Sequence, residues 1–124
     1  MYRYFNPNPC GRNTSDCAIR AIAKALGIDW KTAYTMLCEE GREMCELPNA
    51  NSVWGAVLKK EGFIKRVISC AFPNCYTINE FCEDHPRGTY VLGTGSHVVT
   101  AIDGDYFDSW ESGEEIPCYY WYRY

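Results

Sequence analysis

Apolar side chains recur every three or four residues in three segments of the first half of the chain, and a glycine closes each segment. This spacing is typical of amphipathic helices. It predicts helices over residues 16–26, 29–41 and 52–61. Residues 1–15 contain prolines and other turn formers with little periodicity, so we expect an irregular segment there.

The pattern changes after residue 62. Branched and aromatic residues now form short runs between turn formers, as is typical of strands, with one more short helical segment among them. We expect a helix over residues 78–84 and strands over residues 63–69, 89–92, 97–102, 106–110 and 118–122. Helices first and antiparallel strands later predict a single α+β domain that spans residues 1–124.

Three aromatic residues of the first half lie at helical spacing: Trp30 and Tyr34 in the second predicted helix and Trp54 in the third. On the second helix, Trp30 and Tyr34 share a face with Ala33 and Leu37. This spacing favours a place in the core over a place in a cleft. We therefore expect all three aromatic side chains to be buried.

The charge of the chain bears on its partners. The 124 residues include 12 Lys and Arg against 16 Asp and Glu, a formal net charge of −4, and no basic run. Nucleic acid is not an expected partner, because phosphate binding depends on clustered positive charge. No segment approaches the roughly 20 apolar residues of a membrane helix, and the N-terminus lacks an apolar stretch of signal-peptide length. We therefore expect a cytoplasmic protein without a membrane partner.

The chain has eight cysteines. In the expected cytoplasmic setting they should be reduced thiols, most of them small core residues. The nearest approaches to a zinc-binding pair are Cys70 with Cys75 and Cys38 with Cys45, and neither pair has a histidine at ligand spacing. We therefore expect no metal and no cofactor.

Cys17 differs from the other cysteines in its position. It falls in the first turn of a predicted helix, directly after a run of N-cap residues. Unpaired backbone N–H groups and the helix dipole favour a thiolate there. Asp16 is expected to cap the helix, which would direct its carboxylate to backbone N–H groups and away from the sulfur. Cys17 is therefore the candidate nucleophile, and the alternative is a half-buried thiol that fills space at the helix start.

The two histidines occupy different settings. His85 lies in a polar loop that contains Pro86, where a solvated side chain is expected. His97 follows the turn-forming residues 93–96 and opens an apolar strand, so its ring should lie at the end of a sheet. A histidine at a strand start is usually structural, and its neighbours decide whether it does more.

A carboxylate is predicted beside His97. The Asp-Gly pair at residues 103–104 indicates a two-residue hairpin with a type I′ turn. In that register His97 lies opposite Trp110, and Asp108 is its diagonal neighbour on the same face. Two side chains can close this diagonal of roughly 7 to 8 Å to a hydrogen bond. Asp108 would then orient His97 as the third member of a Cys-His-Asp triad, unless a one-residue slip moved it to the other face.

The chain resembles small papain-like cysteine peptidases. The resemblance rests on residues 13–22 (NTSDCAIRAI), 95–104 (GSHVVTAIDG) and 108–110 (DSW), and it spans most of the chain. It is nearest to proteins of phages and bacterial mobile elements, and more distant to the double-glycine leader peptidases of bacteriocin exporters. It implies a helical half with the nucleophile Cys17 and a β half with His97 and then Asp108, on either side of a cleft.

One position departs from the family pattern. The family places a glutamine that binds the oxyanion about six residues before the nucleophile, where this chain has Gly11. Asn13 offers the same amide donor, and with the Cys17 backbone N–H it is expected to take that role.

Three hypotheses follow from the sequence. The first is a cysteine peptidase or related thiol-dependent acyl-transfer hydrolase that acts on a peptide or protein with Cys17, His97, Asp108 and Asn13. The second is a catalytically inactive papain-like protein of a phage or mobile element that binds or inhibits another factor. The third makes Cys10 and Cys17 a redox pair, although their spacing is unlike CxxC.

Overall fold

The computed structural model describes residues 1–69 and 76–123 of the chain. This part is α+β, with four helices and a six-stranded sheet. The helices are α1 (Cys17–Leu26), α2 (Trp30–Met44), α3 (Asn51–Lys60) and α4 (Ile78–Asp84). The strands are β1 (Tyr2–Tyr4), β2 (Ile64–Val67), β3 (Thr89–Gly93), β4 (Val98–Ile102), β5 (Asp105–Asp108) and β6 (Tyr119–Arg123). The helix and strand predictions are thus confirmed to within a few residues at each end.

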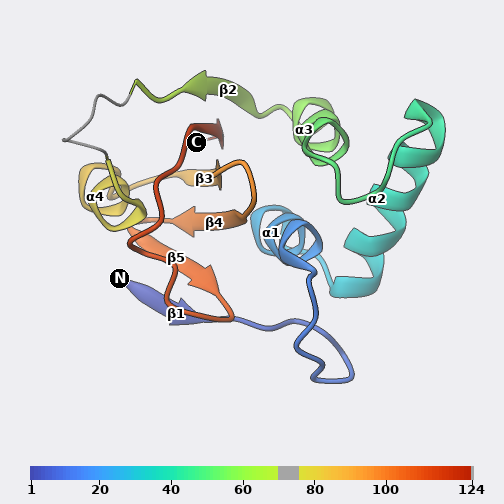
Figure 1. Cartoon of the computed structure of the whole chain (residues 1–124), viewed down its shortest axis with the longest axis horizontal. Helices are drawn as coiled ribbons and strands as arrows, with labels where there is room; N and C mark the ends of the chain where they lie inside the picture. Colours follow the sequence, from blue (N-terminus) through green and yellow to red (C-terminus); the bar gives the residue numbers. More distant parts are fainter. Residues whose placement is uncertain (70–75, 124) are drawn as a thin grey trace.

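The sheet is mixed, which corrects the prediction of a purely antiparallel one. Its strand order is β1-β5-β4-β3-β6-β2, with β1 and β2 at the two edges (Figure 1). All neighbours are antiparallel except β1, which pairs parallel to β5 and places Tyr4 beside Asp108. The prediction that residues 1–15 form an irregular segment is therefore wrong for Tyr2–Tyr4. Three residues are too few to show an alternating pattern, and only the pairing with β5 makes them a strand.

The hairpin that joins β4 and β5 has the predicted register. Ile102 pairs with Asp105 and Thr100 with Phe107. Asp103 and Gly104 between the strands both have positive φ, 50° and 86°, as a type I′ turn requires. This register brings the residue before β4 and the last residue of β5 to the same end of the sheet.

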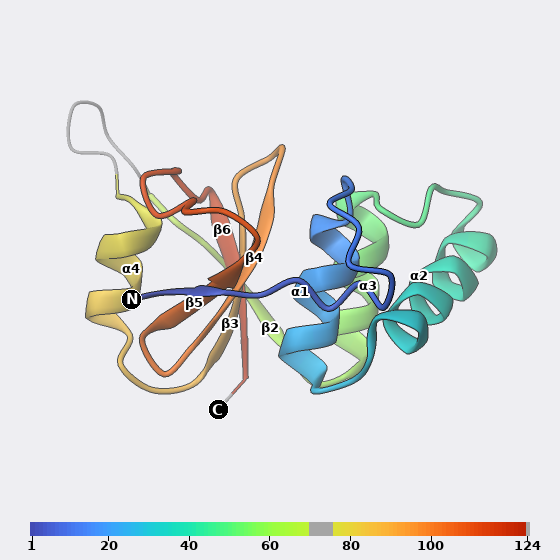
Figure 2. The same cartoon turned by 90° about the horizontal axis from the view of Figure 1, so that it is seen from below.

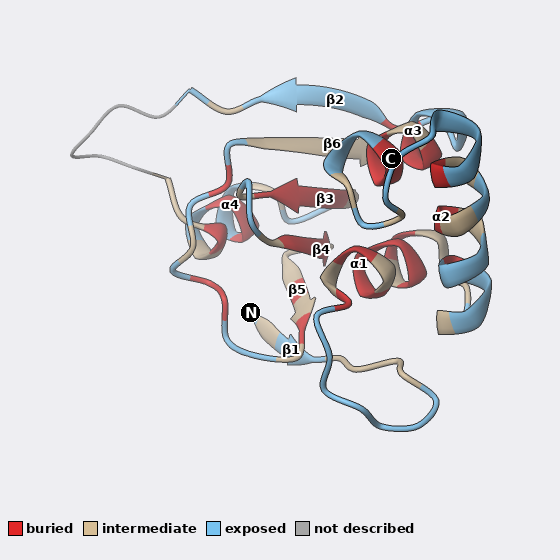
Figure 3. Cartoon of the chain, turned by 45° about the vertical axis from the view of Figure 1, so that its right-hand side comes forward, coloured by how far each residue is buried: buried red, intermediate tan, exposed pale blue. Residues whose placement is uncertain are grey.

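Helices cover both faces of the sheet. α4 lies on one face, α1 and α3 lie on the other, and α2 forms an outer layer against them (Figure 2). One buried cluster joins α1, α2 and α3 to the sheet through Val91 and Val98. A second cluster joins α4 to the opposite face through Leu92 and Val99. Because adjacent residues of a strand point to opposite faces, β3 and β4 are mostly apolar and are buried on both sides along most of their length (Figure 3).

α2 begins as predicted and ends later. Its N-cap is Asp29, whose side chain accepts a hydrogen bond from the Thr32 backbone N–H. The helix continues through Gly41 to Met44. A Cβ atom at Gly41 would lie 2.7 Å from the carbonyl oxygen of Glu46, so the glycine permits a close backbone approach and does not end the helix.

The burial of the aromatic residues matches the prediction only in part. Trp54 is fully buried, as expected. Trp30 is half-buried, and Tyr34 is 47% exposed and stacks on Trp30 with ring centroids 5.2 Å apart. The prediction for Tyr34 is wrong because α2 is an outer-layer helix, and only a narrow stripe of it faces α1 and α3.

The cysteines are less buried than predicted. Of the six in the described residues, only Cys82 is buried; Cys17 and Cys38 are half-buried, and Cys10, Cys45 and Cys118 are exposed. All six are free thiols, including the pair considered for redox chemistry. Cys70 and Cys75 lie outside the described residues.

None of the described helices is both long enough and apolar enough to cross a bilayer.

The core predicts unequal effects for two isoleucines. Ile22 of α1 is fully buried, whereas Ile64 of the edge strand β2 is 49% exposed. We expect Ile22→Ala to lower the free energy of unfolding by about 2 to 5 kcal/mol, because it leaves a cavity in the core. Ile64→Ala is the matched control and should change it by about 0.5 kcal/mol or less. Urea denaturation followed by circular dichroism measures both values, and equal losses would contradict this description of the core.

Candidate active site

Cys17 is the first residue of α1 and is half-buried. The first intrahelical hydrogen bond runs from the Arg20 backbone N–H to the Asp16 carbonyl, so the N–H of Cys17 has no partner within the helix. No acidic residue lies in the first turn. The thiol therefore lies at the positive end of the helix dipole, as predicted.

His97 and Asp108 meet at one end of the sheet. His97 directly precedes β4 and is held by its turn: its backbone N–H donates to Thr94 Oγ1 at 3.0 Å, and its carbonyl accepts from the Thr94 N–H at 2.9 Å. The Nε2 atom of His97 lies 2.6 Å from Asp108 Oδ2. The structure thus brings together the imidazole and carboxylate that the hairpin register had placed on one face.

The other side of the imidazole faces Cys17. Both residues line the same hollow, and hydrogen bonding and charge between the two groups lower the pKa of the thiol and raise that of the imidazole. Because Nε2 is engaged with Asp108, Nδ1 is left for the sulfur. The nucleophile, base and carboxylate predicted from the sequence therefore form one connected row.

The electrostatics of the row favour a charged Cys17–His97 pair. Burial raises the pKa of the Cys17 thiol, but the hydrogen bond and positive charge of His97 lower it. A backbone hydrogen bond at Val98 and the charge of Arg20 act in the same direction, and the net pKa of Cys17 lies below its ordinary value. Burial lowers the pKa of His97, but its hydrogen bonds to Asp108 and Cys17 and the charges of both raise it to about 9.

Asp108 is fully buried and accepts from four donors. Oδ2 receives His97 Nε2 at 2.6 Å and Ser112 Oγ at 2.5 Å. Oδ1 receives Arg20 Nη2 at 2.9 Å and the Ser109 backbone N–H at 2.8 Å. Burial raises the pKa of Asp108, but the hydrogen bonds from His97 and Ser112 and the charges of His97 and Arg20 hold this pKa below its usual value. The carboxylate is therefore ionised and acts only as an acceptor, so Nε2 of His97 carries a proton.

Sequence reasoning missed Arg20 and Ser112 and misassigned Asp16. The Asp16 side chain makes no capping hydrogen bond. Its carboxylate instead accepts from Arg20 Nη1 at 2.6 Å and from Trp30 Nε1 at 2.8 Å. The spacing of Asp16 and Arg20, four residues apart, and the place of Arg20 among apolar residues of α1 were signals of a buried ion pair.

A hollow of about 250 Å³ opens above the thiol. Asn13 and Ser15 of the segment before α1 line it on one side, and Ser96 and Trp110 on the other. Asn13 is exposed on this rim, on the same hollow as Cys17. Trp110 is 46% exposed, and its ring centroid lies 5.1 Å from that of His97. The hollow gives a carbonyl group access to the sulfur from solvent.

His85 lies apart from this site and is not the solvated side chain that was predicted. It follows α4, is half-buried, and stacks on Phe81 with ring centroids 3.8 Å apart. Its Nδ1 lies 2.8 Å from the Phe81 carbonyl oxygen. The loop pattern did not reveal this contact, because α4 ends one residue before His85 and directs the ring back over the helix.

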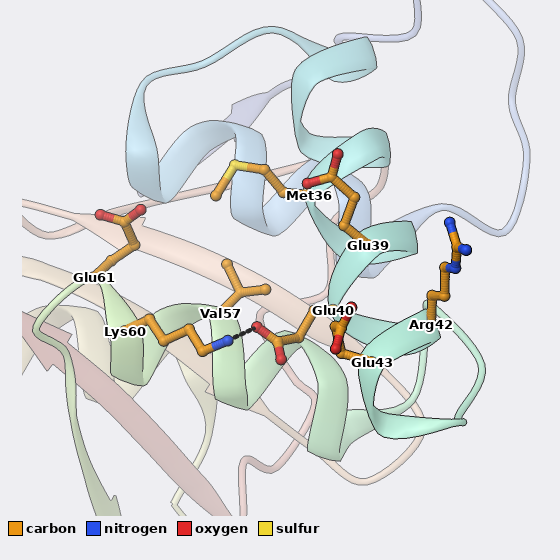
Figure 4. A pocket seen from close by; sticks show the side chains of 8 residues that line it. All are labelled: Met36, Glu39, Glu40, Arg42, Glu43, Val57, Lys60 and Glu61. Atoms are coloured by element: carbon orange, nitrogen blue, oxygen red, sulfur yellow. Dashed lines mark ion pairs between the residues drawn. The ribbon is translucent and has the colours of Figure 1, made fainter.

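A larger hollow of about 410 Å³ lies between α2 and α3 (Figure 4). It is lined by Glu39, Glu40 and Glu43 of α2 and by Lys60 of α3, whose Nζ pairs with Glu40 Oε1 at 2.7 Å. None of the predicted site residues lines it. The described residues also contain no group of three or more His, Cys, Asp or Glu placed to hold a metal ion.

Comparison of the chain with family models, curated proteins and solved structures found no match. A proposal for the function of the chain therefore rests on the geometry of the site.

The raised pKa of His97 predicts an unusual titration. His97 should change charge near pH 9, against about 6.5 for a free histidine, because Asp108 and Cys17 stabilise the imidazolium. The protonated ring should stabilise the fold fully below about pH 6.5, and this contribution should be lost as the pH rises through 9. NMR of the His97 ring carbons across pH 5 to 10 measures the midpoint. A midpoint below 6.5 would mean that burial outweighs both partners.

Proposed function

We propose that the chain is a cysteine peptidase or a related thiol-dependent acyl-transfer hydrolase with a papain-like arrangement of helices and sheet. The observation that carries this proposal is the row Cys17, His97 and Asp108: the thiol lies at a helix N-terminus and lines one hollow with His97, whose Nε2 lies 2.6 Å from the buried Asp108 carboxylate. The order of a helical part that holds the nucleophile and a sheet that holds the base and carboxylate supports it further. Its substrates are peptides or proteins, and it needs no cofactor.

In the first half of the reaction the Cys17 thiolate attacks a carbonyl carbon, and the carbonyl electrons move onto the oxygen to form a tetrahedral oxyanion. The Nδ1–H of His97 then gives its proton to the leaving nitrogen. The C–N bond breaks, the amine departs, and a thioester to Cys17 remains. Asp108 keeps the ring in place and stabilises its charge throughout.

In the second half His97 acts as a base. Its Nδ1 takes a proton from a water molecule that attacks the thioester carbonyl. The second tetrahedral intermediate collapses, the C–S bond breaks, and the carboxylic acid leaves. The thiolate and imidazolium are restored. If an amine replaces the water, the same steps transfer the acyl group.

The oxyanion that forms during the reaction needs hydrogen-bond donors to stabilise its negative charge. The Cys17 backbone N–H has no partner within α1 and lies at the positive end of the helix. Asn13 lines the same hollow and can direct its side-chain amide toward it. These two donors bind the oxyanion in place of the glutamine side chain that Gly11 does not provide.

The proposal places the protein in a reducing compartment. The six described cysteines are free thiols, and a thiolate nucleophile requires that Cys17 remain unoxidised. The cytoplasm meets this requirement.

Selective alkylation tests the activated thiol. Cys10 is exposed and Cys17 is half-buried, so accessibility alone predicts faster labelling of Cys10. We expect iodoacetamide at pH 6.5 to label Cys17 roughly tenfold faster or more, because a larger share of it is thiolate. His97→Ala should abolish this preference while Cys10 reacts as before. Peptide mass spectrometry gives both rates, and equal labelling in the wild type would reject the proposal.

Cleavage tests the reaction itself. Incubation with a mixed peptide library should give new termini with the wild type and none with Cys17→Ala. On a peptide so identified, Asn13→Ala should lower kcat by about 10² to 10³ with little change in KM, since the donor acts on the transition state. Asn13→Asp keeps the shape but replaces the donor with a carboxylate that repels the oxyanion, so it should be at least as slow. An activated thiol that cleaves no peptide would instead favour the binding or inhibitor function.

A further inference from the structure

Arg20 is placed to control the geometry of the site without touching the reacting atoms. It lies on α1 three residues after Cys17, so the helix carries both side chains as one rigid unit. The side chain is only 5% exposed. A buried arginine must have its donors paired, and the partners of Arg20 are two carboxylates.

The two oxygens of Asp108 have different partners. Oδ2 accepts from the reactive side, His97, and Oδ1 accepts from Arg20 Nη2 at 2.9 Å. Without Arg20, Oδ1 would keep only the bond from the backbone N–H of Ser109, its neighbour in the chain, and the carboxylate could turn more freely about its Cβ–Cγ bond and carry the imidazole with it. The bond from Arg20 opposes this rotation, because it fixes the second oxygen from a different element.

The guanidinium is itself fixed from the far side. Its Nη1 donates to Asp16 Oδ1 at 2.6 Å, and Asp16 Oδ2 accepts from Trp30 Nε1 at 2.8 Å. Asp16 is 3% exposed and Asp108 is fully buried, so both ion pairs are shielded from solvent. A planar fork can make these two contacts at once, whereas a lysine presents a single ammonium that cannot reproduce the pair.

We propose that Arg20 is a positioning residue, whose guanidinium fixes the Asp108 carboxylate so that Oδ2 faces His97. This inference rests on the proposed function, because it assigns to Arg20 the alignment of that same triad. The Asp16 carboxylate and the Trp30 indole hold the guanidinium in place. The consequence is that the reactivity of Cys17 depends on the shape of the Arg20 side chain and not on its positive charge alone.

The pH dependence of Cys17 alkylation tests this inference and needs no substrate. In the wild type the rate of Cys17 alkylation should rise with pH as the thiol loses its proton, and this rise is the acid limb of the pH profile. In Arg20→Met and in Arg20→Lys this limb should move to higher pH by about one unit, toward its position in His97→Ala. Arg3→Met is the matched control, because it removes an exposed arginine–aspartate pair with Asp105 and should leave the limb unchanged.

Each outcome separates the alternatives. If Arg20→Lys retains the wild-type limb, the charge suffices and the positioning role is wrong. If both Arg20 variants retain it, Arg20 has no part in the site, although the triad stands. If both variants fail to fold, as judged by near-ultraviolet circular dichroism, Arg20 serves stability and the inference is overturned. If wild-type Cys17 reacts no faster than Cys10, the proposed function fails first.

Discussion

The site depends on one buried carboxylate, that of Asp108, on which donors from separate parts of the chain converge. His97 reaches it from the start of β4, Arg20 from α1, and Ser112 from the loop after β5. A buried carboxylate without partners is costly, and removal of one partner from a buried ion pair typically costs about 3 to 5 kcal/mol. The folded state that satisfies Asp108 is therefore also the state in which the Cys17 thiol and the His97 imidazole are adjacent.

Hydrophobic burial alone does not define this arrangement. The apolar face of α1 determines which side of the helix meets the sheet, but apolar contact is non-directional and leaves sliding and rotation of the helix weakly determined. Two buried polar contacts supply the missing direction. Thr100 of β4 donates to the Ala21 carbonyl of α1 at 2.7 Å, and Arg20 binds Asp108 at 2.9 Å. With both made, the start of α1 has one position relative to β4 and β5, and Cys17 meets His97.

The sequence was informative where the governing contacts are local. The Asp103-Gly104 turn determined the register of β4 and β5, and that register placed Asp108 beside His97. The period of apolar residues located α1 to α4 for the same reason. It was uninformative where a distant element decides. β1 is a strand only because β5 pairs with it, and Asp16 turns away from the helix end because it accepts from Trp30 of α2 and from Arg20, which is itself bound to Asp108 of β5.

The two cysteines Cys17 and Cys82 show that burial alone does not determine the pKa of a thiol, because the partner of the sulfur can reverse its effect. Burial raises the pKa of both thiols. For Cys82, on the buried face of α4 that packs against the sheet, burial prevails and the pKa rises to about 11, so the group stays a neutral core side chain. For Cys17 the hydrogen bond and charge of His97 reverse the direction. His97 in turn keeps its charge because of Asp108. The pKa of the Cys17 thiol thus depends on Asp108, a carboxylate that does not contact the sulfur and acts on it through His97.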